Sequence, residues 1–393
     1  MQRYDSYKPS GVKWLGEIPS HWEVIPMKYC MQIKNGMDYK QVVADYGYPV
    51  IGSGGQFAYA SDYMHDGEVV FFGRKGTIDK PLHFKGKFWA VDTMFYAIPK
   101  KIYGKFLYYV GLTIPYKYYS TATALPSMTQ TDLGNNPICF PPLEEQTAIA
   151  NYLDTATAKI DAAIAQQQKM IDLLNERKQI IINRAVTKGL NPNAKMKDSG
   201  VEWIGEVPEH WEILPYRYLF YNLDKLRMPI TADQRSRNNP QYDYYGASGV
   251  IDKIDYYNVE DKVLLIGEDG ANLLMRNLPL IYKAEGKFWV NNHAHILKPI
   301  RDDYDYLAYV MEAADYTLFI TGSAQPKLSQ ANLNCVKLPI PPLEEQKVIL
   351  DYLSKRTSKI DVAIDEANNM ISLLQERNQI IINEVVTGKV RVG

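Results

Sequence analysis

The amino-acid sequence contains one stretch twice, and this duplication restricts the possible folds more than any other feature. Residues 141–190 and 341–390 are identical at 28 of 50 positions, and both begin with Pro-Pro-Leu-Glu-Glu-Gln. A shorter pair lies upstream, where Gly-Val-Lys-Trp-Leu-Gly-Glu at 11–17 is matched by Gly-Val-Glu-Trp-Ile-Gly-Glu at 200–206. The chain therefore consists of one unit, a variable part followed by a constant part, that occurs twice.

The constant parts are predicted to be long helices. Proline before the first turn suits a helix start, and Glu144 and Glu145 complement the positive end of the helix dipole. With Gly189 and Gly388 at the expected ends, each helix would contain about 45 residues and rise about 65 Å. Apolar residues recur at the coiled-coil spacing of about 3.5: Ile149, Leu153, Ile160, Ile164, Ile171, Leu174 and Ile181, then Ile349, Leu353, Ile360, Ile364, Ile371, Leu374 and Ile381.

An apolar stripe this narrow needs a partner in water. We predict that the two helices pair with each other as an antiparallel intramolecular coiled coil. A core helix within each domain and self-association between molecules are the alternatives. Pairing within the chain would relate the two copies by a pseudo-two-fold axis.

The variable parts are predicted to be strand-rich. β-type runs at 68–72 and 262–266 each lead into a loop with glycine at both ends, and the loop interior is Arg-Lys in the first copy and Glu-Asp in the second. A purely structural turn explains the glycines but less easily the charge reversal. The fold class is therefore α+β, with two mixed, strand-rich domains joined by two long antiparallel helices. The expected boundaries are a first domain at 1–140, a central helix at 141–190, a second domain at 191–340 with its linker at 191–200, and a C-terminal helix at 341–393.

Composition sets the broad class. A length of 393 residues suggests two or three domains, and 46% apolar with 23% charged residues is typical of a globular protein. No apolar run reaches the roughly 18 residues of a membrane span, and the first residues lack the apolar stretch of a secretory signal. Three cysteines far apart in sequence argue against a disulfide framework. We expect a cytoplasmic protein with no membrane partner.

No complete catalytic site is visible in the sequence. The phosphate-binding G-x-x-x-x-G-K-[ST] loop is absent, and so is an Asn/Asp-Pro-Pro-Tyr/Phe segment for methyl transfer to an amine. Glu-Gly-Lys at 285–287 resembles part of a nuclease site, but its counterpart at 85–87 lacks the acid. His293 and His295 could hold a metal, yet no third ligand is evident and a packed or hydrogen-bonded pair is preferred. We predict no catalytic residue and no metal site.

Several motifs together resemble one known family. They are the tandem Pro-Pro-Leu-Glu-Glu-Gln helices, the opening Gly-Val-Lys-Trp-Leu-Gly-Glu-Ile-Pro-Ser-His-Trp at 11–22, Ile-Gly-Glu-Asp-Gly-Ala-Asn at 266–272 and Gly-Ser-Ala-Gln-Pro-Lys-Leu-Ser at 322–329. The first-copy counterpart of the last motif, at 123–129, lacks the Gln and the Lys. Across essentially the whole chain, the sequence resembles the specificity subunit of type I restriction–modification systems.

That resemblance implies a DNA-reading subunit with no activity of its own. In the family, each variable domain is a target-recognition domain that reads one half of a split DNA sequence. The helices set the spacer and dock two modification subunits, which methylate adenine with S-adenosylmethionine, and ATP-driven restriction subunits join them. We therefore expect double-stranded DNA and both kinds of subunit as partners. We expect no cofactor in this chain, with S-adenosylmethionine, ATP and Mg in the partners.

The candidate DNA contacts are donors and acceptors of the types that read bases or phosphates. They are Lys34, Arg74, Lys75, Ser127 and Thr129 in the first domain, and Arg235, Arg237, Asn272, Arg276, Gln325, Lys327 and Ser329 in the second. The net charge of −1 is too weak to indicate nucleic acid by itself. It leaves open the alternative of a two-headed adaptor that binds proteins on a coiled-coil scaffold.

Overall fold

The computed structural model describes residues 2–119, 126–231, 233, 235, 240–322 and 325–392. The chain forms two compact units, which we call unit 1 (residues 1–168 with 368–393) and unit 2 (residues 169–367). The long helices α4 (Leu143–Lys188) and α8 (Leu343–Val386) each contribute one half to each unit. Among the described residues, neither these helices nor any other is apolar enough to cross a membrane.

Unit 1 is built on a seven-stranded sheet in the order β4-β10-β8-β9-β6-β7-β5, in which only β6 and β9 pair in parallel. Its described residues also form two small two-stranded sheets, β1-β2 and β11-β3. The elements are β1 (Tyr7–Pro9), β2 (Glu17–Pro19), β3 (Glu23–Pro26), η1 (Met27–Tyr29), β4 (Met31–Asn35), β5 (Val43–Ala44), β6 (Tyr48–Gly52), β7 (Gly55–Ala60), β8 (His65–Gly73), β9 (Leu82–Ala90), β10 (Met94–Pro99), α1 (Gly104–Gly111), α2 (Tyr116–Tyr119), α3 (Gln130–Asn135) and β11 (Pro137–Phe140).

Unit 2 repeats this plan with a six-stranded sheet in the order β15-β20-β18-β19-β16-β17. Again one pair, β16 with β19, is parallel. The elements are β12 (Met196–Asp198), β13 (Glu206–Pro208), β14 (Glu212–Pro215), η2 (Tyr216–Tyr218), β15 (Phe220–Asn222), η3 (Asp224–Leu226), β16 (Tyr242–Gly246), β17 (Gly249–Ile254), β18 (Val259–Gly267), α5 (Asn272–Met275), β19 (Ile281–Val290), β20 (Ala294–Pro299), α6 (Tyr304–Ala313), η4 (Thr317–Phe319), α7 (Gln330–Leu333) and β21 (Lys337–Ile340).

The central strand of each sheet is buried on both faces. On β8, Val70 and Phe72 point into the core that contains α1, whereas Val69 and Phe71 point into a second core behind the sheet. On β18, Leu264 and Ile266 face the α6 core, and Val263 and Leu265 face the other way. Burial on both faces explains why these strands are continuous apolar runs without alternation.

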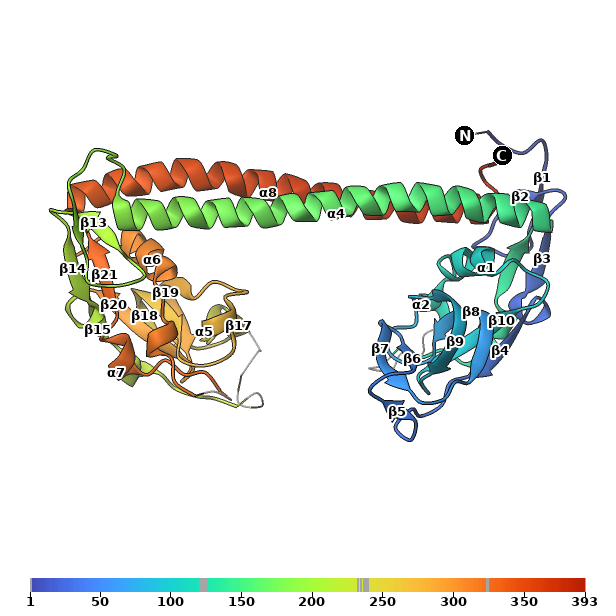
Figure 1. The fold of residues 1–393 in the computed structure, drawn as a ribbon, viewed down its shortest axis with the longest axis horizontal. Coiled ribbons are helices and arrows are strands. Elements are labelled where there is room, and N and C mark those ends of the chain that lie inside the picture. The colour runs from blue at the N-terminus through green and yellow to red at the C-terminus, as the bar shows by residue number, and fades with distance from the viewer. Residues whose placement is uncertain are drawn as a thin grey trace. The chain divides into compact units, whose positions relative to one another are not determined.

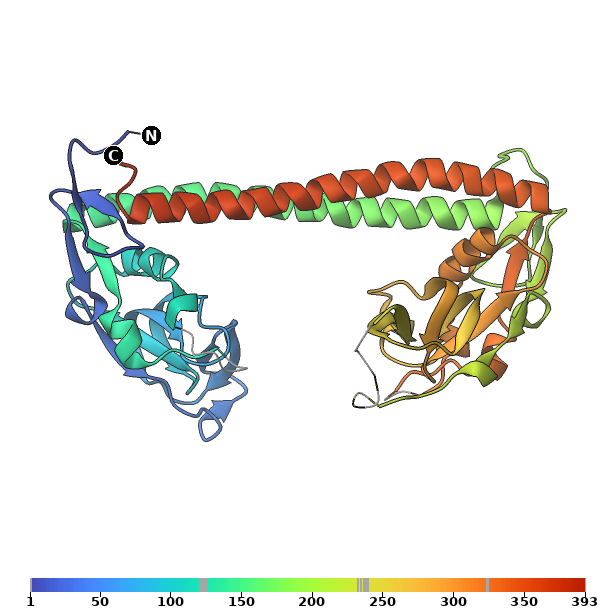
Figure 2. The same ribbon diagram turned by 180° about the vertical axis from the view of Figure 1, so that it is seen from behind.

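The long helices pack antiparallel within each unit, as Figures 1 and 2 show. In unit 1, Ile149 and Leu153 at the start of α4 share a core with Val385 and Val386 at the end of α8. In unit 2, the end of α4 packs in the same way against Ile349 and Leu353 at the start of α8. The α+β class with paired long helices is thus confirmed. All fourteen seam residues are buried or half-buried.

Candidate nucleic-acid interface

In each unit, a glycine-rich turn meets the segment that precedes a short helix, and the contact is the same in both units. We call these the loop pairs: residues 73–76 with 126–129 in unit 1, and residues 267–270 with 325–329 in unit 2. In unit 1, Lys75 and Ser127 form an antiparallel bridge, and the Gly76 N–H donates to the Pro126 carbonyl at 2.9 Å. In unit 2, Asp269 bridges Lys327, and the turn again donates from its last glycine to a proline carbonyl, at 3.1 Å.

A third segment holds each loop pair from the other side. The Arg74 N–H donates to the Thr93 carbonyl at 2.8 Å, and the Glu268 N–H donates to the His293 carbonyl at the same distance. Each loop pair therefore rests on the turn that enters β10 or β20. Backbone hydrogen bonds of this kind fix the loop while leaving its side chains free to vary.

In unit 1 the loop pair is basic. The Arg74 guanidinium lies over the ring of buried Phe95, 5.9 Å from its centroid, and Lys75 is exposed beside it. Lys34 is exposed on β4, next to Ile33, whose carbonyl accepts from Gln130 of α3. These cations are suited to phosphates or to guanine.

Two other predicted contacts in unit 1 have structural roles. Thr129 caps α3, because its hydroxyl accepts from the Asp132 N–H at 3.0 Å and donates to the Asp132 carboxylate at 2.6 Å. Ser127 is half-buried in the bridge to Lys75. Their contact with DNA stays a prediction.

In unit 2 the same place holds a network of opposite charges. Glu268 accepts from Arg227 and from Lys327, the latter at 3.0 Å. Beneath it, His295 approaches Asp224 with Nδ1 at 2.6 Å and the Leu328 carbonyl with Nε2 at 2.7 Å. Unit 1 has Phe95 where unit 2 has His295, and Arg74 where unit 2 has Glu268. One backbone scaffold thus carries two chemistries.

The carboxyl groups of Asp224 and Glu268 are ionised in this network, although burial favours their neutral forms. Burial raises the pKa of Asp224, but hydrogen bonds from His295 and from the Ile296 N–H outweigh it, and the pKa lies below its usual value. Burial likewise raises the pKa of Glu268, and the bonds from Arg227 and Lys327 lower it further than burial raises it. The acidic loop is therefore neutralised within the unit.

The remaining predicted residues of unit 2 are placed differently. Gln325 is exposed in the loop pair, and Ser329 caps α7 by accepting from the Asn332 N–H at 3.2 Å. Arg235 pairs with Asp252 at 3.5 Å over the Tyr244 ring. Arg237 lies outside the described residues.

Asn272 and Arg276 hold a surface turn together. The Asn272 amide donates to the Leu278 carbonyl at 3.1 Å, and its oxygen accepts from the Leu278 N–H at 2.8 Å. Arg276, with a left-handed φ of 50°, donates to the carbonyls of Glu312 and Ala314 at the end of α6. These bonds occupy much of their hydrogen-bonding capacity, and DNA contact by either stays a prediction.

Sequence reasoning missed Asp224 and Arg227, the residues that pair with His295 and Glu268 in this network. No local signal marks them, because Arg227 lies 41 residues and Asp224 lies 71 residues from the groups they bind. His293 and His295 are hydrogen-bonded, to Asp269 and Asp224, in line with the role preferred from the sequence. Across the part of the chain that the structure describes, no cluster of three or more His, Cys, Asp or Glu could hold a metal ion.

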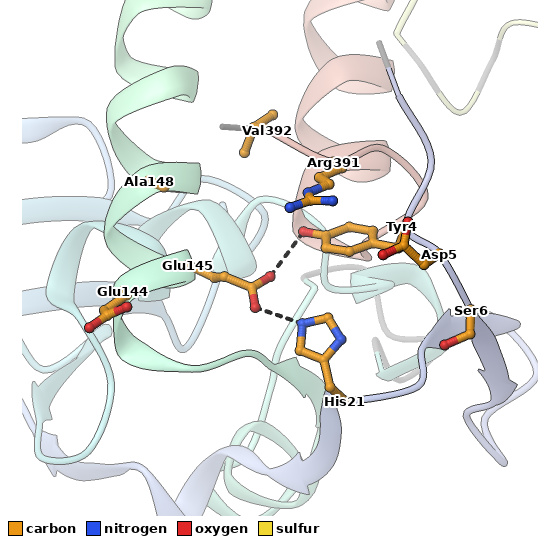
Figure 3. Close-up of a pocket in the computed structure, with 9 residues that line it drawn as sticks. All are labelled: Tyr4, Asp5, Ser6, His21, Glu144, Glu145, Ala148, Arg391 and Val392. Atoms are coloured by element: carbon orange, nitrogen blue, oxygen red, sulfur yellow. Dashed lines mark hydrogen bonds and ion pairs between the residues drawn. The ribbon is translucent and has the colours of Figure 1, made fainter.

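The repeated motifs meet at the start of each long helix. In unit 1, Glu145 accepts from His21 at 2.6 Å, from the Trp22 indole at 3.0 Å and from the Tyr4 hydroxyl at 3.1 Å, as Figure 3 shows for Tyr4 and His21. Burial and the Glu145 charge raise the pKa of Tyr4, which keeps the phenol a donor. This node ties the first variable domain to α4.

The second copy has the same node. Glu345 accepts from His210 at 2.7 Å and from Trp211 at 3.1 Å. The buried amides of Gln146 and Gln346 each donate to the first proline of the motif and accept from the backbone N–H at the start of α1 or α6. The repeated His-Trp and Pro-Pro-Leu-Glu-Glu-Gln segments are therefore two parts of one joint.

Comparison with known proteins agrees with this architecture. The type I restriction modification DNA specificity domain matches twice, at residues 19–171 and 208–370, one match for each copy. The chain belongs to this family.

Individual relatives match over nearly the full length. The chain is 27% identical to the putative type I restriction enzyme MjaX specificity subunit of Methanocaldococcus jannaschii, covering 96% of each. It is 25% identical to the MjaVIII specificity subunit of the same organism, covering 84% of this chain and 78% of the relative. A solved chain described under complex assembly and conformational transition of the type I R-M system shares the fold, with a TM-score of 0.67, 14% identity and coverage of 95% of this chain and 99% of that one.

Proposed function

We propose that this chain is the subunit that gives a type I restriction–modification complex its DNA sequence specificity, with each loop pair reading one half of a split target. The proposal rests on the two loop pairs, one in each unit. They are held by the same backbone bonds, yet one presents Arg74 and Lys75 and the other presents Lys327 and Gln325. A protein that reads two different half-sites would require equivalent backbone supports that carry different side chains.

The chemistry of the complex is assigned to partner subunits. Methylation of adenine would use S-adenosylmethionine in two modification subunits, and cleavage would use ATP and Mg in restriction subunits. In this chain the proposal needs only binding, and flipping of the target base would be done by a partner while the loop pairs hold the duplex. The bases of double-stranded DNA would be read by Arg, Lys and Gln side chains in the major groove.

The long helices carry a surface that would dock the modification subunits. On α4, Met170, Leu173 and Ile180 are exposed, and on α8 the equivalent Met370, Leu373 and Ile380 are exposed. We call each set an apolar stripe. Ile182 packs into the core of unit 2, and Ile180 lies two residues, or about 200°, around the helix from it. The stripe therefore points away from the domain core.

Each unit contains one apolar stripe: that of α4 lies in unit 2 and that of α8 lies in unit 1. Exposed apolar stripes on a helix are typical of surfaces that pack against another helix. Two equivalent stripes would bind two copies of the same partner. This supports docking of two modification subunits rather than one.

Methylation sequencing of the host genome, with and without this gene, tests the proposal directly. We expect a split motif that is methylated on both strands and lost on deletion. Exchanging residues 1–140 for another recognition domain should change one half of the motif only. A change in both halves would contradict independent reading, and co-purification without any methyltransferase would favour the two-headed adaptor.

The helices would also set the spacer between the half-sites. Inserting seven residues after Gln168 and after Ala367, where the chain passes between the units, keeps the coiled-coil register. Seven helical residues rise about 10.5 Å, so the spacer between the two half-sites of the motif should lengthen by about 3 base pairs. Insertion into one helix alone is the control and should abolish methylation. An unchanged spacer length in the variant with both insertions would show that the helices do not set the spacer.

A further inference from the structure

Each unit exposes an apolar side chain beside its loop pair. In unit 1 it is Phe57 on β7, 56% exposed, and in unit 2 it is Ile251 on β17, 49% exposed. Each stands two residues after the glycine that begins its strand. The two side chains therefore occupy equivalent positions on the duplicated scaffold.

In unit 1, close contacts connect Phe57 to the loop pair. Its ring covers Gly52, where a Cβ would lie 3.2 Å from the ring and 3.8 Å from the Val91 methyl group. Val91 opens the turn at 91–93, and two carbonyls of that turn hold the backbone N–H and the guanidinium of Arg74, at 2.8 and 3.5 Å. Phe57 and Arg74 thus flank one three-residue turn.

Unit 2 has the same arrangement. Ile251 covers Gly246, where a Cβ would lie 3.0 Å from Ile251 and 3.3 Å from the Asn291 amide. The Asn291 side-chain oxygen accepts from the His293 N–H at 2.8 Å, and the His293 carbonyl holds the loop residue Glu268. The apolar side chain again flanks the turn on which the loop pair rests.

A methionine accompanies each of these residues. Met37 and Met228 are exposed, and the carbonyl of each accepts from the indole of a tryptophan on the strand before the turn, Trp89 at 3.2 Å and Trp289 at 2.8 Å. Phe57 also meets Tyr39 edge to face, with ring centroids 5.2 Å apart. The apolar surface is therefore held in place rather than loosely exposed.

The polar and charged side chains near this apolar surface indicate what kind of ligand it contacts. Lys75 is exposed in the loop pair of unit 1, and Lys34 is exposed on β4. In the loop pair of unit 2, Gln325 is exposed, and so is Lys327, which pairs with Glu268. Cations and amides close to an exposed apolar side chain suit the major groove, where thymine alone presents a methyl group. We propose that Phe57 and Ile251 each contact the 5-methyl group of a thymine, one in each half of the target. The inference rests on the proposed function.

Single replacement of each thymine by deoxyuridine, which lacks only that methyl group, tests the contact. The probe is a duplex of about 30 base pairs carrying the split motif, bound by the chain with its co-purified methyltransferase subunits. Loss of one buried methyl should weaken binding about fourfold. We expect such a position in each half-site. Phe57→Ala should remove the effect in one half only, and Ile251→Ala in the other half only.

Tyr29→Ala and Tyr218→Ala are matched controls. Both tyrosines are exposed, in η1 and η2, at the opposite ends of β4 and β15 from the loop pairs. They should leave the deoxyuridine effect unchanged. Because Phe57 and Ile251 are themselves half-exposed, their variants should fold normally, which melting curves will check.

The outcomes separate this inference from the proposed function. A complex that binds no specific motif would overturn both. A complex that binds the motif but ignores deoxyuridine, or keeps the full effect in Phe57→Ala and Ile251→Ala, would overturn the thymine contact alone. A half-site with no thymine on either strand would do the same.

Discussion

His295→Ala is expected to destabilise unit 2 by about 3–5 kcal/mol, because it leaves the buried Asp224 carboxylate without its closest hydrogen-bond partner. The His295 side chain is 1% exposed and that of Asp224 is 8% exposed. Without the imidazole, Asp224 loses its closest partner and the Leu328 carbonyl loses a donor. Urea unfolding gives the free energy, and hydrogen exchange of peptides from β18 and β20 should locate the loss in unit 2.

His293→Ala is the matched control, two residues away. His293 pairs with Asp269 at 2.8 Å, but its side chain is 46% exposed, so we expect a cost of about 0–1 kcal/mol. Equal effects of the two substitutions would show that burial of the His295 pair is not the cause.

The stabilisation from this network should also depend on pH. Burial raises the pKa of Asp224 and of Glu268, but their hydrogen bonds outweigh it and both pKa values are lowered on folding. A carboxyl with a lowered pKa stabilises the fold only while it is ionised. The contribution is therefore complete above the ordinary carboxyl pKa of about 4 and is lost as pH falls through the lowered values. The difference between wild type and His295→Ala should shrink in that acid range.

The long helices could be predicted because their signals are local. The 3.5-residue apolar spacing and the terminal glycines lie within one stretch of chain, and Gly189 and Gly388 do follow the helices with φ of 68° and 73°. The strand order could not be predicted, because pairs such as β4 with β10 join residues about 60 positions apart. The same applies to the parallel pair of β6 with β9.

The candidate site was predictable only in part for a related reason. The glycine turns and the lead-in segments are visible in sequence, so Arg74, Lys75 and Lys327 could be selected. Residue type does not reveal when a polar side chain is used inside the fold, as Asn272 is in its surface turn. Nor does it show that an apolar residue such as Phe57 faces outward beside a loop.

The docking proposal makes the second large prediction. Leu173 on α4 is 55% exposed at the centre of its apolar stripe. Leu173→Glu would remove about 1.5–3 kcal/mol of apolar burial with a partner and would also bury a carboxylate. We expect at least a hundredfold weaker docking at that stripe. Native mass spectrometry should then show one modification subunit bound in place of two.

The duplication makes the prediction quantitative. Leu373→Glu, at the equivalent position of α8, should remove the other modification subunit, and the double variant should bind neither and leave the motif unmethylated. Gln179→Glu places the same charge on α4 at an exposed position away from the stripe, and it should keep both subunits. Since Leu173 and Leu373 contribute to the surface and not to the core, the melting temperature should stay within a few degrees of wild type. Two bound subunits in the double variant would exclude the apolar stripes as the docking surface, because a buried pair of carboxylates could not be accommodated at both positions without loss of binding.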